Sequence, residues 1–286
     1  MKQPMLLTDL PNGVGRVLLG CAGVIALMQP PLNASAQNVN LGTANNFAVM
    51  AGSTVTSTGP TVIIGGNVGA SPGTAVTGFP PGTISAPYTT IAGGPVAAQA
   101  QADLNTAFNY AAGLAPNQVL SGQDLGGLTL TPGVYFFAST AQLTGTLTLN
   151  DQGNPNAEFV FQIGSSLTTA ANSSVLTING GTVPGADVFW QVGSSATLET
   201  GTAFEGNLLA YAAITAAAGA TDLDGRLLAE TGAVTLAGNT ITVPASEVIG
   251  GGGGGNVPDT GSTLLLLGSG FVSLLACGRR VSSVRW

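Results

Sequence analysis

A short strand pattern that recurs along the chain restricts the fold more than any other feature. Four segments each contain an apolar residue followed by threonine, and a Gly or Asn, which turns favour, comes a few residues later. The threonines of this pattern are Thr168, Thr197, Thr215 and Thr235. Their spacing is uneven, as expected when insertions fall in the loops of a stacked structure and leave its walls unchanged. The repeat therefore predicts a β-solenoid.

Side-chain alternation predicts which way these threonines point. Successive residues of a strand face opposite sides, and apolar residues flank Thr215 and Thr235 on both sides. The threonines are therefore expected outside and the apolar flanks inside. Two further segments fit the pattern loosely and add Thr56 and Thr144 to the set. Coils stacked about 4.8 Å apart would align all these threonines in rows, each with a methyl and a hydroxyl group.

The segment 95–112 departs from the β pattern. Pro95 suits the first turn of a helix, and Gly113 suits its C-terminal end. The apolar residues between them fall on one helical face. They are Ala97, Ala100, Leu104, Ala107, Phe108 and Ala111. We expect one long helix that lies along the solenoid and covers its core.

Charge and composition exclude several classes of function. The 286 residues include 6 Lys and Arg against 13 Asp and Glu, so nothing is available to neutralise a nucleic-acid backbone. The chain has no histidine, and both of its cysteines, Cys21 and Cys277, lie near the ends. The common catalytic triads and zinc sites need these residues. No nucleic acid, cofactor, metal or catalytic residue is therefore predicted.

Carboxylates remain as the alternative source of chemistry. Two of them could act as a pair in glycoside hydrolysis, but the sequence does not place any two at the required separation. Acidic residues that are simply solvated at the surface are the more common explanation. The acids concerned are Asp187, Glu199, Glu205, Asp222, Asp224 and Glu230. The run 222–225 (DLDG) matches half of a calcium loop but lacks the later oxygen ligands. We predict that the protein is not an enzyme.

The N-terminal segment 1–36 has the organisation of a secretory signal peptide. Lys2 and Arg16 precede an apolar run over 17–28, and the small residues 34–36 (ASA) suit signal peptidase cleavage. The run 18–21 (LLGC) also resembles a lipoprotein cleavage box. The apolar run continues beyond Cys21, which favours an ordinary signal peptide and a secreted domain over 37–249.

The C-terminal segment has the organisation of a sorting tail. A glycine-rich linker over 250–256 precedes the run 257–261 (VPDTG), an apolar stretch over 264–276 and a basic pair at 279–280. Residues 257–286 resemble the exosortase-type sorting signals of Gram-negative bacteria. The resemblance implies an exosortase-like processing enzyme, transient anchoring in the membrane and a cell-surface location. A plain C-terminal membrane helix is the alternative.

Seven segments, in order, resemble the microbial ice-binding (antifreeze) protein family. They are residues 47–56, 65–73, 77–82, 130–135, 159–165, 188–193 and 225–229. The resemblance implies a mainly β, discontinuous three-faced β-solenoid. Its N-terminal segment would contribute coils out of sequence order, and one long α-helix would pack alongside.

The resemblance also implies a flat face that binds the ice crystal surface. In that family the face is associated with a Thr-Ala/Gly-any-Thr/Asn pattern, which 169–172 (TAAN) and 58–61 (TGPT) match. Segments 197–200 and 215–218 match it in part. The candidate ice-binding residues are Thr56, Thr58, Thr144, Thr168, Thr169, Asn172, Thr197, Thr200, Thr215 and Thr235.

Two functions from different classes follow. The first is an antifreeze protein that adsorbs to ice and inhibits crystal growth or recrystallisation, or attaches the cell to ice. The second is a surface adhesin or extracellular-matrix component without ice activity, because threonine is also a good strand former on any solvated sheet. A regular outward threonine array would favour the first, and a concave patch of aromatic and acidic side chains would favour the second.

Overall fold

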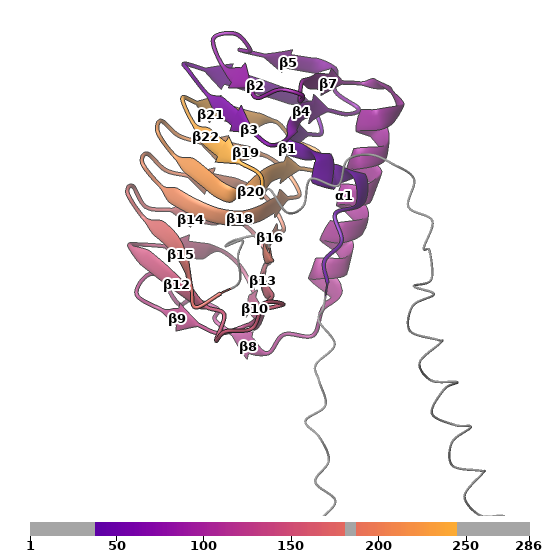
Figure 1. Cartoon of the computed structure of the whole chain (residues 1–286). Coiled ribbons are helices and arrows are strands. Elements are labelled where there is room, and N and C mark those ends of the chain that lie inside the picture. The colour runs from indigo at the N-terminus through magenta and orange to yellow at the C-terminus, as the bar shows by residue number, and fades with distance from the viewer. Residues whose placement is uncertain (1–37, 181–186, 245–286) are drawn as a thin grey trace, which may run out of the picture. The chain divides into compact units, whose positions relative to one another are not determined.

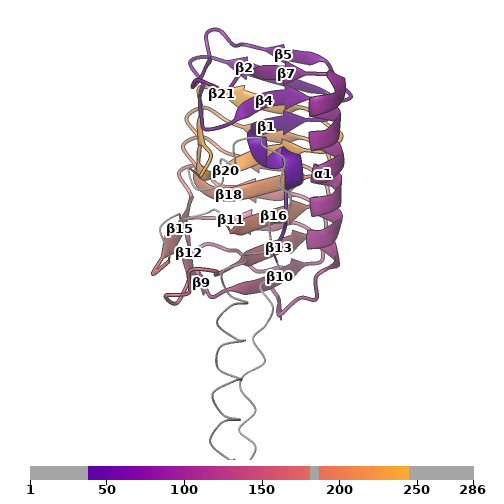
Figure 2. The same cartoon turned by 45° about the vertical axis from the view of Figure 1, so that its right-hand side comes forward.

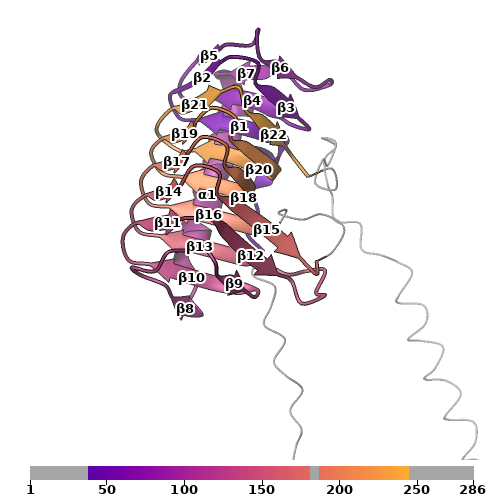
Figure 3. The same cartoon turned by 90° about the vertical axis from the view of Figure 1, so that its left-hand side faces the viewer.

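The computed structural model describes residues 38–180 and 187–244, which form a mainly β structure with one long helix (Figure 1). The predicted signal peptide, linker and sorting signal lie outside these residues. All strand pairs within the described residues are parallel. The chain winds in coils of three strands, so that equivalent strands of successive coils stack on three faces (Figure 3).

The first face is a seven-stranded sheet. In stacking order its strands are β11 (Ala141–Leu143), β14 (Leu167–Thr169), β17 (Ala196–Leu198), β19 (Ile214–Ala216), β21 (Val234–Ala237), β2 (Thr54–Thr58) and β5 (Ala75–Thr77).

The second face, here called the helix-covered face, stacks strands from all coils. They are β8 (Gln118–Val119), β10 (Gly133–Phe137), β13 (Phe159–Ile163), β16 (Val188–Val192), the later parts of β18 (Ala203–Ala210) and β20 (Thr221–Ala229), β1 (Phe47–Ala51), β4 (Asn67–Ala70) and β7 (Thr90–Ala92).

The third face is built from the remaining strands. They are β9 (Thr129–Leu130), β12 (Thr146–Asn150), β15 (Ser174–Ile178), the first parts of β18 and β20, β22 (Thr240–Thr242), β3 (Val62–Ile64) and β6 (Thr83–Ile84). Strands β18 and β20 run from the third face onto the helix-covered face. Their pairing shifts register between Glu205 and Asn207, where Gly206 (φ 111°) and Asp224 (φ 57°) turn the corner.

The stacking order differs from the chain order. Strands β1, β2 and β3 pair with β20, β21 and β22, so the N-terminal coils stack on the last C-terminal coil. Strands β4 to β7 then complete the stack at this end of the solenoid. Helix α1 (Gly94–Gly113) carries the chain back along the stack to β8, at the other end (Figure 2). The expected discontinuous, three-faced solenoid is confirmed.

Helix α1 packs through the predicted apolar stripe. All six stripe residues are buried, and they contact the helix-covered face together with the short helix η1 (Gly42–Asn46). The helix extends one residue beyond the predicted range at each end. At its C-terminus Gln162 Nε2 donates to the carbonyls of Ala111 (2.8 Å) and Leu114 (2.8 Å), which satisfies groups that a helix end leaves open.

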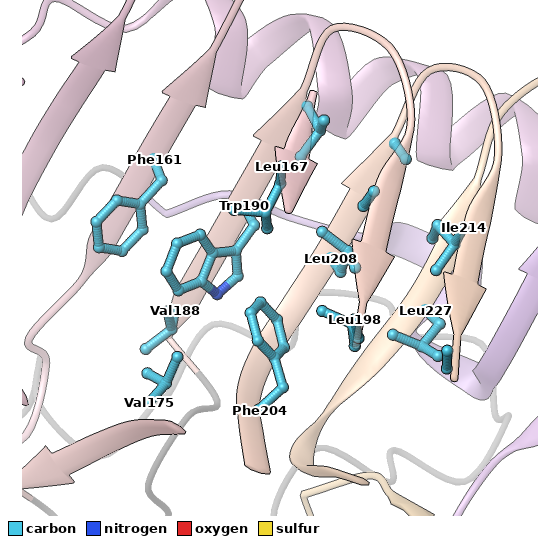
Figure 4. Close-up of a cluster of buried hydrophobic side chains, with 14 of the residues drawn as sticks. Phe161, Leu167, Val175, Val188, Trp190, Leu198, Phe204, Leu208, Ile214 and Leu227 are labelled. Carbon is cyan, nitrogen blue, oxygen red and sulfur yellow. The ribbon is translucent and has the colours of Figure 1, made fainter. Parts of the chain in front are cut away.

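Aromatic side chains fill one end of the solenoid interior. Tyr135, Phe161 and Trp190 stack on successive coils, with ring centroids 5.4 Å and 4.0 Å apart, and Phe204 lies 5.0 Å beyond Trp190. Figure 4 shows Phe161, Trp190 and Phe204 of this stack. Trp190 is fully buried, and its indole N–H donates to the Glu205 carbonyl at 3.1 Å. Each ring therefore packs against the coil on either side.

We predict that Trp190→Ala lowers the free energy of unfolding by about 3–5 kcal/mol, because it opens a cavity between two stacked rings. Urea unfolding followed by circular dichroism measures the change. Val119→Ala is the control, since Val119 is 64% exposed, and a change within about 0.5 kcal/mol is expected for it. Equal effects of the two substitutions would contradict the stacked core.

A cluster of carboxylates lies where β12, β13 and β16 meet the loops that join their coils. Burial raises the pKa of Glu158 to about 7, and the negative charge of Asp187 adds to this effect, while a hydrogen bond from the Val39 amide to Oε1 (2.9 Å) opposes it. Burial and Asp187 likewise raise the pKa of Asp151 to about 6. Asp151 and Glu158 are therefore protonated more readily in the folded state than in the unfolded state.

This cluster predicts a pH-dependent stability difference between the wild type and Glu158→Gln. The stabilisation from protonated Glu158 is complete below its ordinary pKa of 4.5 and is lost as the pH rises to about 7. Across that window the variant should gain stability relative to the wild type. Urea unfolding of both proteins at pH values on either side of the window measures this difference. A difference that does not change with pH would contradict the raised pKa.

Candidate functional site

A single column of outward side chains crosses the whole seven-stranded sheet. The strand register places one residue from each strand in this column. In stacking order they are Gln142, Thr168, Thr197, Thr215, Thr235, Thr56 and Thr77. Thr197 is half-exposed and the others are exposed. The sheet thus presents six threonines in consecutive strands, spaced about 4.8 Å apart by the backbone ladder.

Small side chains flank this column on both sides. Two residues before it lie Thr140, Ser166, Ser195, Ala213, Ala233, Thr54 and Ala75, all exposed or half-exposed. Two residues after it, on the first six strands, lie Thr144, Ala170, Glu199, Ala217, Ala237 and Thr58, again exposed or half-exposed. On the seventh strand the chain turns at Gly78 (φ 88°) directly after Thr77, and Phe79 packs against the core. Because nearly all of the flanking side chains are Thr, Ser or Ala, they rise to similar heights above the backbone. The outward surface of the sheet is therefore flat.

A stack of left-handed residues forms the edge between this sheet and the third face. The residues are Asn172, Gly201, Gly219, Gly238 and Gly59, with φ values of 58°, 72°, 70°, 63° and 75°. Asn and Gly are the residues that most readily adopt this conformation. Backbone bonds join successive turns, such as Asn172 N–H to the Thr200 carbonyl (3.0 Å) and Gly238 N–H to the Thr58 carbonyl (2.8 Å).

Buried polar side chains lie beneath this edge. Asn239 donates from Nδ2 to the carbonyls of Ala217 (2.8 Å) and Ala220 (2.9 Å), and its Oδ1 accepts from the Ala237 amide (2.6 Å). In the next coil, Ser57 donates to Thr61 at 2.7 Å. The Asn239 bonds to Ala217 and Ala220 connect the turns of successive coils from the inside, and the Ser57–Thr61 bond closes its own turn, so that the edge of the flat surface is held in place.

The structure places most of the predicted residues on this surface and corrects two of them. Thr56, Thr168, Thr197, Thr215 and Thr235 share the column, which agrees with the predicted alignment. Three further exposed candidates, Thr58, Asn172 and Thr200, lie at the edge of the sheet.

Thr169 was wrongly predicted to be a surface residue. It is fully buried, since it follows the outward Thr168 and strand alternation turns it inward. Its Oγ1 lies 2.7 Å from Thr202 Oγ1 and accepts from the Glu199 amide at 2.9 Å. It therefore supports the turn from inside.

Thr144 is exposed but does not belong to the column. The register pairs Gln142, and not Thr144, with Thr168. The alignment placed Leu143 opposite Leu167, whereas Ala141 holds that position. Thr77 was missed because its place in the column depends on the pairing of β5 with β2, which the degenerate repeat does not specify. In the β21 coil the left-handed turn residue is Gly238, and Asn239, which follows it, is buried.

Metal sites and membrane-spanning helices would indicate other functional classes. In 38–180 and 187–244, no group of three or more His, Cys, Asp or Glu could hold a metal ion. Across those same residues, no helix has the length and apolar character needed to cross a membrane.

Comparison with known proteins gives one consistent result. The model of a family described as Ice-binding-like matches residues 49–242. An "Ice-binding protein" of Nostoc sp. (strain HG1) is 49% identical over 269 residues, which cover 92% of this chain and 95% of that protein. An "Ice-binding protein" of Colwellia sp. is 35% identical over 73% of this chain and 85% of its own length.

Solved structures agree with these sequence relatives. The crystal structure of an ice binding protein from an Antarctic Biological Consortium superposes with a TM-score of 0.68 at 45% identity, over 73% of this chain and 92% of that one. That of an ice-binding protein from the Antarctic ascomycete Antarctomyces psychrotrophicus gives 0.67 at 41% identity, over 72% and 98%.

We predict that Asn239→Ala lowers the free energy of unfolding by about 3 kcal/mol, because it removes three hydrogen bonds of a buried side chain, two to the carbonyls of Ala217 and Ala220 and one from the Ala237 amide. Thermal or urea unfolding measures the loss. Asn172→Gly is the control, since glycine accepts the left-handed conformation and Asn172 is exposed. A loss for Asn172→Gly as large as that for Asn239→Ala would mean that the turns do not depend on the buried bonds.

Proposed function

The chain belongs to the Ice-binding-like family, and from this premise we propose that it binds ice through the outward surface of the seven-stranded sheet. The observation that carries the proposal is the column of six threonines in consecutive strands. A crystal surface is periodic in two dimensions. A protein surface that matches it must be flat and repeat regularly, as this sheet does.

The mechanism is adsorption, without covalent chemistry. Threonine methyl groups and alanines supply apolar contact, while the hydroxyl groups hold water at positions that continue into the crystal lattice. Thr and Ala have few rotamers, and the parallel ladder already fixes their backbone, so binding costs little conformational entropy. Adsorbed protein molecules hold back the advancing ice surface where they are bound, and thereby inhibit ice growth or recrystallisation.

The other two faces are less suited to this role. Helix α1 and η1 cover the second face. The third face carries the exposed side chains of Leu176, Leu223 and Ile64 together with the acid Glu205, so its outward surface is uneven in height and polarity. The seven-stranded sheet is the face that is both open and uniform.

An adhesin that binds sugar through aromatic side chains fits the surface less well. Across the described residues, Tyr110 and Tyr211 are the large exposed aromatic side chains, and neither lies among the outward residues of the seven-stranded sheet. Ice is therefore the partner that the surface chemistry favours.

We also propose that the protein acts outside the cell. The N-terminal signal peptide would secrete the domain. The 257–261 motif would bring the chain to an exosortase-like enzyme while the C-terminal segment holds it in the membrane. A domain kept at the cell surface could attach the cell to ice or protect the brine around it. Detection of the mature protein in the surface fraction, with its C-terminal segment removed, tests this proposal.

We predict that Thr215→Tyr abolishes or strongly reduces ice binding, because the ring stands above a flat surface in the middle of the threonine column. The measurement is the fraction of fluorescently labelled protein that is taken up by a slowly growing ice ball. Leu223→Tyr on the third face and Val96→Tyr on helix α1 are the controls, since both positions are exposed outside the proposed site.

These variants separate the possible outcomes. Uptake that is lost in Thr215→Tyr and kept in both controls supports the proposed face. Uptake lost only in Leu223→Tyr would move the site to the third face. Wild-type protein that is excluded from ice would contradict the proposed function.

A further inference from the structure

Glu199 interrupts the uniform chemistry of the seven-stranded sheet. Among the outward residues of this sheet in the described part of the chain, it is the one charged side chain. It lies two residues after Thr197 and is half-exposed. The corresponding positions on the neighbouring strands β14 and β19 are Ala170 and Ala217. A carboxylate therefore stands between two methyl groups on an otherwise neutral surface.

The Glu199 side chain has no evident part in holding the fold. Its main chain is engaged: the amide donates to Thr169 Oγ1 at 2.9 Å, and the carbonyl accepts from the Thr202 amide at 3.0 Å. These bonds do not depend on the side chain. No donor among the described residues forms a hydrogen bond with the carboxylate. By contrast, Glu205 accepts from the Thr177 amide (3.0 Å) and hydroxyl (2.7 Å). The carboxylate of Glu199 thus points to water without a structural partner.

A carboxylate at this place works against contact with ice. It is longer than its alanine neighbours, so it raises the surface locally. It also keeps a tightly held hydration shell, and removing a charged group from water without a partner is costly. The water lattice of ice supplies no counter-charge. Ice contact over Glu199 is therefore unfavourable both sterically and electrostatically.

The two parts of the sheet on either side of Glu199 differ. On the side of β19, β21 and β2, every outward residue in the column and on its flanks is Thr or Ala. On the side of β14 and β11, a single strand, β14, separates Glu199 from β11, which ends the stack and has Gln142 in the column. The uninterrupted part of the flat surface is therefore the part built by β19, β21 and β2.

We infer that Glu199 is a specificity-determining residue that divides the sheet and confines ice contact to the β19–β21–β2 side. This inference rests on the proposed function. The contact area is then set by one side chain and not by the length of the solenoid. Removal of the carboxylate joins the two parts into one larger contact surface.

The first test replaces the carboxylate in the full protein. Glu199→Ala should raise the thermal hysteresis, the gap between the melting and freezing temperatures, by roughly twofold or more, because a charged group no longer has to be desolvated. Glu199→Gln removes the charge but keeps the length of the side chain, so its thermal hysteresis should lie between that of Glu199→Ala and that of the wild type. Asp224→Asn is the control, since it removes an equal charge on a different face at a position whose φ of 57° asparagine accepts.

The second test measures coupling between Glu199 and the far part of the sheet. In the wild type, Thr168→Tyr should reduce hysteresis much less than Thr215→Tyr does. In the Glu199→Ala background both tyrosines should reduce it to the same degree, because Thr168 now belongs to the contact area. A merely structural role of Glu199 would change the unfolding free energy and leave the ranking of the two tyrosine variants unchanged.

The outcomes distinguish this inference from the function on which it rests. Wild-type protein without any hysteresis or crystal shaping would contradict the proposed function itself. An active wild type whose hysteresis equals that of Glu199→Ala, or in which Thr168→Tyr and Thr215→Tyr are equally damaging, would overturn the inference alone.

Discussion

The parallel hydrogen-bond ladder between successive coils is the interaction on which the rest of the structure depends. It holds neighbouring strands about 4.8 Å apart and fixes their register, so that Thr197 lies opposite both Thr168 and Thr215. The same ladder stacks the rings of Phe161 and Trp190 inside. The ladder also continues where the chain order is interrupted, because β1 pairs with β20. A slip of one residue would turn the threonines inward.

The outward surface of the seven-stranded sheet is flat because of this ladder and because of the turns at the edge of the sheet. Left-handed residues turn the chain sharply at one edge, and buried amide and hydroxyl groups such as those of Asn239 and Thr169 hold the turns from within. Small side chains then keep the outward surface level. Asp151, Glu158 and Asp222, whose pKa values are raised by burial, lie in corners or in the interior, away from the flat surface.

Local periodicity predicted the parts of the fold that depend on near neighbours. The apolar stripe of helix α1 and the inward and outward sides of Ile214, Thr215 and Ala216 are set by residues a few positions apart. The same alternation should have excluded Thr169, since Thr168 already faces outward. The register of Gln142 and the position of Thr77 depend on pairing with distant strands, which a degenerate repeat does not specify. The out-of-order stacking of β1 on β20 came from the family resemblance alone.

The most direct test of the account is to watch a single ice crystal in a nanolitre osmometer while the purified protein is present. If the flat threonine surface binds ice, the crystal develops facets and stops growing over a measurable interval below its melting point. A crystal that stays round and grows freely as soon as it is cooled below the melting point would contradict ice binding by this protein.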